Sequence, residues 1–362
     1  MDQVTVRVID ASERDYWDDN VQQCPLVHPL NAYDWGTVRE GDGWSAIRLV
    51  AERAGRFCGA LQLLTKKLPA LPWYIFYGPK GFICAPGDRE TVFALDRKVV
   101  ELAKSYRAIF LRIDPHITEA EAKSFDAIVS SLAYRHLKQR WTFWNSPRDV
   151  FRIDLSGWRT TDDLLNSLDR DTRRCIRKAA KEGVVVEAAL DEGDLRKFYD
   201  IFRTFSDAKG FMARGFGYQK RLWECYVARD RGRLFLAKYN GQVIGGLLCI
   251  VFGRRCLAMH MGTPYQYHRL HSYYAYVWES IRWAKSQDCV WYSFRGVGTT
   301  PSQEAFKSKF GPKVVPLVGY YDRPFRPLLY RLFYFGEFTV LPAAWPLLVR
   351  VRRILSWGKN AH

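Results

Sequence analysis

An internal duplication constrains the fold of this chain more than any other feature of its sequence. Residues 50–60 (VAERAGRFCGA) align without a gap with residues 236–246 (LAKYNGQVIGG). Each copy has the pattern of a strand, a short turn with glycine and a second strand, and the pair Asn240-Gly241 favours a type I′ hairpin. Self-similarity of this kind indicates two units of one fold rather than two unrelated domains.

The order of predicted elements also repeats. A helical pattern covers residues 90–105 and again 272–286, and a buried strand follows each time, at 108–113 and 289–294. Hairpin, strand, helix and strand in this order predict the α/β class with a mixed sheet in each copy. We expect a first domain at 1–148, a second at 149–313, and a basic, apolar tail at 323–362. One strand at 314–321 completes a sheet, and it could return to the first domain.

Charge and cysteine content narrow the class of function. The 362 residues suit two domains, and 55 Lys and Arg against 38 Asp and Glu give a net charge of +17. An excess of this size indicates a polyanionic partner such as nucleic acid, anionic lipid or a phosphorylated substrate. Eight cysteines occur without a C-x-x-C pair, which predicts no zinc site and reduced thiols in a cytoplasm.

Motifs for covalent, metal or redox catalysis are not found. The sequence has no G-x-S-x-G, H-E-x-x-H or dinucleotide fingerprint. A turn that binds the pyrophosphate of coenzyme A normally carries glycines, because backbone N–H groups must approach the phosphates. The turn at 267–273 has no glycine, and the turn at 78–81 contains a proline that removes a donor. A CoA-dependent N-acyltransferase therefore stays only as an alternative.

Several segments stand in an order that is typical of one family. They are Asp154-Leu155-Ser156, Arg173-Arg174, Ile176-Arg177-Lys178-Ala179, Gly183-Val184, Gly210-Phe211 with Arg214, Ile244-Gly245-Gly246, and Phe306-Lys307 with Phe310-Gly311. In this order the chain resembles the FemABX family of non-ribosomal aminoacyltransferases. The resemblance implies two tandem GNAT-like (acyl-CoA N-acyltransferase-like) domains. It also implies transfer of an amino acid from aminoacyl-tRNA to the stem peptide of a lipid-linked or UDP-linked peptidoglycan precursor, with no cofactor.

The resemblance assigns substrate-binding residues in both copies. Arg214 and Tyr218 correspond to a pair that holds the diphosphate of the precursor, and a guanidinium suits that task because it binds phosphate oxygens bidentately. In the first copy, Trp35 and Arg39 correspond to a Trp and a basic residue, usually Lys, that reaches the same phosphates. We therefore expect Arg39 and Arg214 to face each other across a cleft, with guanidinium groups within ~15 Å, roughly the reach of an unscreened interaction. Ordinary surface charge is the alternative for both arginines.

The remaining site residues surround the expected reaction. Phe306 and Lys307 match a Phe-Lys pair of the family, in which the lysine cation stabilises the oxyanion or the departing ribose oxygen. Asp114 could accept a proton from the attacking amine, but its position favours the alternative, capping of the turn before Pro115. His260 stands where the family tends to have a tyrosine that contacts phosphate.

Two basic regions predict macromolecular partners. A short helix carries Arg173, Arg174, Arg177, Lys178 and Lys181, which we assign to tRNA phosphates, with a solvated helix as the alternative. The tail has an apolar run at 332–349 that is broken by Glu337, Pro342 and Pro346 and flanked by arginines, including Arg350, Arg352 and Arg353. Such a run suits an interfacial or re-entrant anchor on an anionic membrane better than a spanning helix. The alternative is a helix packed on the domains.

The sequence thus predicts an aminoacyltransferase of the cytoplasm, peripheral at the inner face of the cell membrane. We expect deletion of residues 326–362 to release it from membranes and leave both domains folded. The alternative in which the protein is not an enzyme is a membrane-surface protein that binds glycan or lipid through its aromatic residues.

Overall fold

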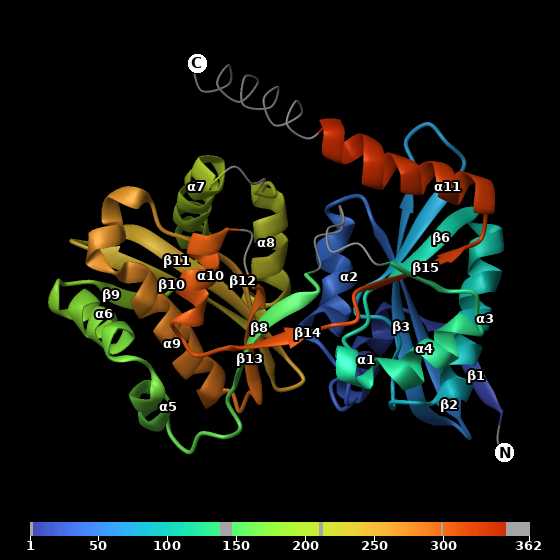
Figure 1. The fold of residues 1–362 in the computed structure, drawn as a ribbon, viewed down its shortest axis with the longest axis horizontal. Helices are drawn as coiled ribbons and strands as arrows, with labels where there is room; N and C mark the ends of the chain where they lie inside the picture. Colours follow the sequence, from blue (N-terminus) through green and yellow to red (C-terminus); the bar gives the residue numbers. More distant parts are fainter. Residues whose placement is uncertain (1–2, 138–146, 210–212, 298–299, 345–362) are drawn as a thin grey trace.

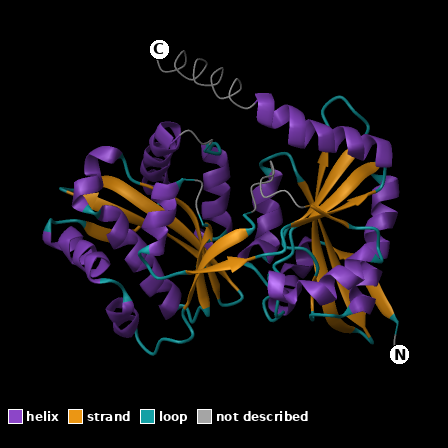
Figure 2. Ribbon diagram, viewed as in Figure 1, coloured by secondary structure: helices purple, strands orange, loops and turns teal. Residues whose placement is uncertain are grey.

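The structure is a computed structural model that describes residues 3–137, 147–209, 213–297 and 300–344. Two α/β domains lie side by side, each built on one mixed sheet (Figure 1). Helices lie against both sheets (Figure 2). The predicted fold class is therefore confirmed.

The sheet of the first domain has the strand order β1-β2-β3-β4-β6-β15-β7, and β5 pairs with β3. Its strands are β1 (Val4–Ile9), β2 (Ser45–Arg53), β3 (Arg56–Lys67), β4 (Tyr74–Gly78), β5 (Ile83–Cys84), β6 (Ala108–Ile113), β7 (Arg135–Leu137) and β15 (Tyr320–Pro324). The helices are α1 (Arg14–Val21), α2 (Tyr33–Glu40), α3 (Arg89–Ser105) and α4 (Ala122–Ser130). Alternate residues of a strand face opposite sides. Accordingly Val50 joins the apolar cluster of α2, and Leu49 and Ala51 join that of α3.

The second sheet has the order β14-β8-β13-β12-β11-β10-β9. Its strands are β8 (Asp149–Asp154), β9 (Val185–Ala188), β10 (Gly232–Tyr239), β11 (Gln242–Phe252), β12 (Arg255–Gly262), β13 (Trp291–Gly296) and β14 (Lys313–Pro316). The helices are α5 (Thr161–Ser167), α6 (Arg170–Lys181), α7 (Glu192–Lys209), α8 (Phe216–Cys225), α9 (Ser272–Ser286) and α10 (Pro301–Ser308).

The two domains share details that confirm the duplication. The hairpins β2–β3 and β10–β11 turn at Ala54-Gly55 and Asn240-Gly241, and all four of these residues have φ between 49° and 77°, as a type I′ turn requires. A register shift follows Ala51 in one hairpin and Ala237 in the other, and the ungapped alignment pairs these two alanines. Each sheet also has one parallel pair, β4 with β6 and β12 with β13, joined through the helix predicted in each copy.

The strand predicted at 314–321 is divided between the two sheets. Residues of β14 pair with β8 of the second sheet, whereas β15 pairs with β6 and β7 of the first. Gly319, at φ +83°, lies in the left-handed region between them, and glycine enters that region without the steric cost of a Cβ. The sequence pattern missed this division because the apolar run continues across it.

An apolar cluster joins the two domains. It contains Trp17 and Val38 of the first domain together with Leu195, Phe198 and Tyr226 of the second, all buried. The hydroxyl of Tyr226 donates to the carbonyl of Pro29 at 3.3 Å. A large apolar contact of this kind favours one fixed arrangement over free domain motion, so the separation between residues on either side is set by packing.

The expectation of a separable tail is wrong for its first part. Pro324 ends β15, and Pro327 begins helix α11 (Pro327–Phe335), which continues into a π-helical turn at Gly336–Val340. Tyr330 is buried against Phe110 of β6, with ring centres 5.6 Å apart. Figure 1 shows α11 along one end of the first domain. The helix therefore belongs to the globular fold.

Glu337, interpreted from sequence as a break in an apolar run, is one of two carboxylates on a buried arginine. Its oxygens accept from Arg112 Nη1 at 2.7 and 2.8 Å, while Asp322 accepts from Arg112 Nε and Nη2, both at 2.7 Å. All three side chains are at most 2% exposed. No helix in the described ranges has the length and hydropathy of a membrane span. Arg350, Arg352 and Arg353 lie outside the described residues.

Candidate functional site at the domain junction

Arg39 is held at the junction by a close contact between α2 and its sheet. A Cβ on Gly36 would lie 2.7 Å from Cβ of Ala46 on β2, so glycine is needed for α2 to pack at this distance. One turn later, Arg39 lies near two indole rings, with its guanidinium carbon 5.9 Å from the centre of Trp35 and 5.5 Å from that of Trp44. Its Nε is 3.6 Å from Oδ2 of Asp42, an ion-pair rather than a hydrogen-bond distance.

Arg214 reaches the same carboxylate from the second domain. It precedes α8, and its guanidinium lies 4.8 Å from the ring centre of Tyr218 in the first turn of that helix. Its Nη1 donates to Oδ2 of Asp42. Because Arg39 and Arg214 contact one oxygen atom, their charged groups lie far closer than ~15 Å. The predicted approach of these two arginines across the junction is confirmed. Gly210 and Phe211 of the predicted motif lie outside the described residues.

Five cations form what we call the junction cluster: Lys66, Arg39, Arg214, Arg295 and Lys307. Burial lowers the pKa of Lys66 and of Arg39, and the neighbouring arginines lower both further. Burial also lowers the pKa of Arg295, with Tyr218 opposing and Arg214 adding to the shift. A row of mutually repelling cations at a domain junction is a site prepared for an anion.

Lys307 lies at the second-domain end of the junction cluster. Its Nζ donates to the carbonyl of Gly296 at 2.6 Å and to that of Phe294 at 3.4 Å. Burial, with a further contribution from Arg295, lowers the pKa of Lys307 to about 8. Phe306 packs in an aromatic group with Tyr273 and other rings, at 5.0 Å between the two ring centres. Phe306 therefore anchors the helix that presents Lys307.

Asp114 is enclosed by donors. Its Oδ1 accepts from the Tyr77 hydroxyl and from the backbone N–H of Lys80, both at 2.8 Å, and its Oδ2 lies 2.6 Å from Lys80 Nζ. The side chain is 4% exposed. These three contacts join both carboxylate oxygens to β4 and to the turn that follows it. This geometry suits the alternative interpretation, a structural anion that fixes the turn at 78–81.

His260 and Trp35 lie beside the junction cluster but point into packed surroundings. His260 Nδ1 is 3.1 Å from Oε1 of Gln219, and its ring lies 6.0 Å from that of Tyr218. Burial, with contributions from Arg295 and Arg214, lowers the pKa of His260 to about 3, so it is neutral near pH 7. Trp35 is 5% exposed, and its indole N–H has no partner within the described part of the chain.

The basic helix is α6, at the far side of the second domain from the first (Figure 1). Arg174, Arg177, Lys178 and Lys181 are exposed, whereas Arg173 is half-buried and donates to the carbonyl of Asn166 at 2.6 Å. The helix is tied to the segment that carries Lys307, because Thr172 Oγ1 donates to the carbonyl of Lys309 at 3.2 Å.

Sequence reasoning missed three members of this site. Asp42 stands three residues after Arg39 between two glycines. Lys66 and Arg295 are each the last residue but one of a strand, β3 and β13 respectively. A charged residue at the end of an otherwise apolar strand is the signal that marks Arg295. Among the described residues, no three His, Cys, Asp or Glu side chains gather in a way that could hold a metal ion. All eight cysteines are free thiols.

Fold and site together define a class of protein: tandem N-acyltransferase-like domains with an arginine from each domain on one carboxylate at the junction. A solved structure of FemX superposes with a TM-score of 0.81 at 20% identity, covering 90% of this chain and 99% of FemX. A tandem GNAT protein from the clavulanic acid pathway gives a TM-score of 0.54 at 13% identity, covering 89% of this chain and 98% of that protein. These likenesses confirm the GNAT-like fold of both domains.

The sequence profile of the FemAB family matches residues 9–242 and 235–336. The chain therefore belongs to the FemAB family, and the resemblance seen in its motifs is confirmed. A relative in this comparison is the lipid II:glycine glycyltransferase of Staphylococcus aureus strain MRSA252, 30% identical over 228 residues. The match covers 62% of this chain and 53% of the relative, so the chain spans about half the length of the curated relatives it matches.

Proposed function

We propose that the protein transfers an aminoacyl group from aminoacyl-tRNA to an amine on the stem peptide of a peptidoglycan precursor. The observation that carries the proposal is the meeting of Arg39 and Arg214, one from each domain, on the same oxygen of Asp42. A substrate diphosphate has the charge and the paired oxygens to take the place of that carboxylate. Family membership supports the reaction class, and the similar S. aureus protein is a lipid II:glycine glycyltransferase.

The reaction needs positioning more than reactive groups, because an aminoacyl ester is already activated. The neutral amine attacks the ester carbonyl, a C–N bond forms, the bond to the ribose oxygen breaks, and the amine proton ends on that oxygen. Lys307 has three N–H donors and two backbone acceptors. Within the described ranges no acceptor takes the third donor, which in this proposal stabilises the oxyanion or the departing oxygen.

The donor approaches from the side of α6 in this proposal. Four cations of that helix are exposed and suit tRNA phosphates. The Thr172 contact to Lys309 connects this surface to the helix that carries Lys307. A CoA donor is less suited, because residues 265–270 of the corresponding turn form a short 3₁₀ helix without glycine.

Transfer is expected to depend on intact tRNA. Purified full-length protein is incubated with charged tRNA and either UDP-linked or lipid-linked muropeptide, and product mass is followed with and without RNase. RNase should abolish the mass increase of one aminoacyl residue, and acetyl-CoA should not replace the tRNA. Arg214→Gln should lower kcat/KM by ~10- to ~100-fold through loss of a charged hydrogen bond. Arg282→Gln, which breaks an exposed ion pair on α9, is the control and should keep full activity. Transfer that survives RNase would contradict the proposal.

We also propose that the outer face of α11 contacts an anionic membrane, which would bring the site to a lipid-linked acceptor. Leu328, Leu332 and Phe335 are 76%, 69% and 59% exposed. Their spacing of four and three residues places them on one helix face. Arg326 and Arg331 are exposed beside them, as suits an interfacial helix on anionic lipid.

Replacing Leu328, Leu332 and Phe335 together with serine is expected to release the protein from membranes. The three side chains are exposed, so replacing them should leave the fold intact. Each side chain that no longer inserts into the membrane should weaken binding by roughly 1–2 kcal/mol, the free energy of burying its apolar surface. The measurement is flotation with vesicles of phosphatidylglycerol and phosphatidylcholine at low and high salt. Leu190→Ser, at an 84% exposed position in the second domain, is the matched control and should float like wild type. Equal flotation of the triple variant would reject this face as the contact.

A further inference from the structure

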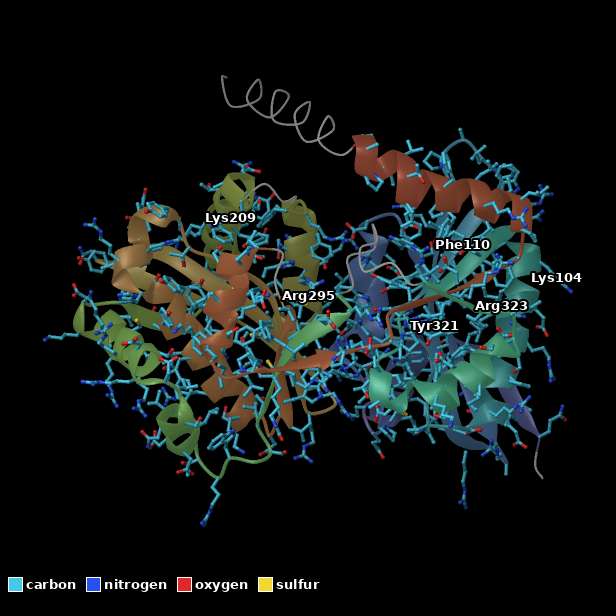
Figure 3. All side chains as sticks on the ribbon, viewed as in Figure 1. Lys104, Phe110, Lys209, Arg295, Tyr321 and Arg323 are labelled. Atoms are coloured by element: carbon cyan, nitrogen blue, oxygen red, sulfur yellow. The ribbon has the colours of Figure 1, made fainter. Side chains whose placement is uncertain are left out.

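Arg295 has an unusual position among the cations of the junction cluster. It lies in β13 near the carboxyl end of that strand, and its backbone has φ +63°, a left-handed conformation that costs a non-glycine residue of order 1 kcal/mol or more. Figure 3 shows Arg295 on the side of the second domain that faces the first. Such strain persists where the surroundings impose it.

Lys307 imposes this conformation. Its ammonium binds the carbonyls of Phe294 and Gly296, the residues on either side of Arg295. The backbone N–H of Arg295 donates to Ser293 Oγ at 3.1 Å, which adds a third fixed contact. The lysine of α10 thus holds both backbone carbonyls that flank Arg295 at the end of β13.

The guanidinium of Arg295 is not neutralised by the acids of the site. Within the described part of the chain it forms no ion pair, and the ionisable groups that act on it most strongly are Tyr218, Arg214, Tyr77 and Tyr320. Asp42 forms ion pairs with Arg39 and Arg214, and Asp114 forms one with Lys80. The side chain is half-buried. A strained and partly desolvated arginine beside other cations is energetically unfavourable unless an anion binds to it and balances its charge.

We propose that Arg295 binds a carboxylate of the acceptor peptide and thereby positions the acceptor between diphosphate and reaction centre; this rests on the proposed function. Arg39 and Arg214 mark the diphosphate end, Lys307 marks the acyl-transfer end, and Arg295 is coupled electrostatically to Arg214 and to Lys307. The stem peptide links those two ends and carries free carboxylates. A planar guanidinium receives a carboxylate with two parallel hydrogen bonds. Arg295 is in this view a substrate-positioning residue.

The test combines protein and ligand variants in calorimetric titrations of the full-length protein. The probes are UDP-linked muramyl pentapeptide, the same compound with its carboxylates converted to carboxamides one at a time, and UDP-MurNAc without peptide. Arg295→Gln should weaken binding of the pentapeptide by ~10- to ~100-fold and leave UDP-MurNAc unchanged. For one of the amidated ligands, the affinity of wild type should fall by the same factor. Arg295→Gln should bind that ligand as tightly as it binds the unmodified pentapeptide, because the protein and ligand changes remove the same interaction.

Other outcomes overturn the inference without touching the proposed function. Equal losses on pentapeptide and UDP-MurNAc would place Arg295 on the diphosphate, and additive losses from protein and ligand changes would show no contact with a carboxylate. If wild type binds neither the UDP-linked nor the lipid-linked pentapeptide, the proposed function fails instead. Arg295→Lys, which keeps the charge, should recover part of the affinity, and Arg282→Gln should behave as wild type. Should Arg295→Gln unfold, as thermal unfolding would reveal, unchanged affinity of wild type for every amidated ligand still rejects the inference.

Discussion

Arg112→Met is expected to destabilise the protein by ~3–5 kcal/mol, the usual cost of leaving a buried charge without its partner. In the wild type, burial alone would lower the pKa of Arg112, but Asp322 and Glu337 outweigh burial and raise it. Removing the cation leaves two carboxylates that are at most 2% exposed. The measurement is chemical denaturation at pH 7, with Arg282→Gln as the control that should change stability by less than ~1 kcal/mol.

Truncation at residue 326 is expected to give insoluble protein, because it removes Glu337 from the buried Arg112 and uncovers Phe110. Soluble, folded protein after this truncation would contradict the packing of α11 on the first domain.

Lys307→Ala is expected to lower kcat/KM by ~10²- to ~10³-fold, the range seen when one donor to a developing oxyanion is removed. Its pKa of about 8 adds a test by pH. The cation is present below about 8 and is lost above it, so kcat/KM of the wild type should fall on the alkaline side with a midpoint there. Lys307→Arg keeps a charge at all accessible pH, and its profile should lack this descending limb.

Stability should respond to Lys307 in the opposite direction. The folded pKa lies below the unfolded value of 10.5, so between pH 8 and 10.5 the unfolded chain binds more protons, and the contribution of this group to stability rises with pH. Activity and this part of the stability should thus change oppositely over one pH interval. If kcat/KM of the wild type continues to rise above pH 9, the proposal that Lys307 acts as a cation in the reaction is rejected.

Local patterns predicted most of the fold because the duplication rests on short-range signals. The turns at Ala54-Gly55 and Asn240-Gly241 and the helix α9 at Ser272–Ser286 depend on neighbouring residues, and the structure has them where the sequence placed them. The division of 314–321 between two sheets depends on which distant strand offers a free edge. The pairing of Arg112 with Glu337, 225 residues apart, is equally invisible in a local pattern.

The site residues also divide into those that a local motif predicts and those that only long-range contacts define. Arg39, Arg214, Tyr218 and Lys307 were predicted because their motifs resemble those of a family, and the structure brings the two arginines together. Asp42 and Arg295 were missed because their meaning comes from contacts across the junction. Asp114 illustrates the reverse: its strand-end position suggested chemistry, but Tyr77 and Lys80 already occupy its oxygens.

The late return of the chain to the first sheet has a consequence for synthesis on the ribosome. Strand β15 lies between β6 and β7, yet it is made about 180 residues after β7, roughly ten to forty seconds later at bacterial elongation speeds. Through that interval the nascent first domain has a gap in its sheet, and Arg112 waits without Asp322 and Glu337. The N-terminal half cannot mature as it emerges, so the exposed edges of β6 and β7 are the places where a chaperone would have to act until the last segment arrives.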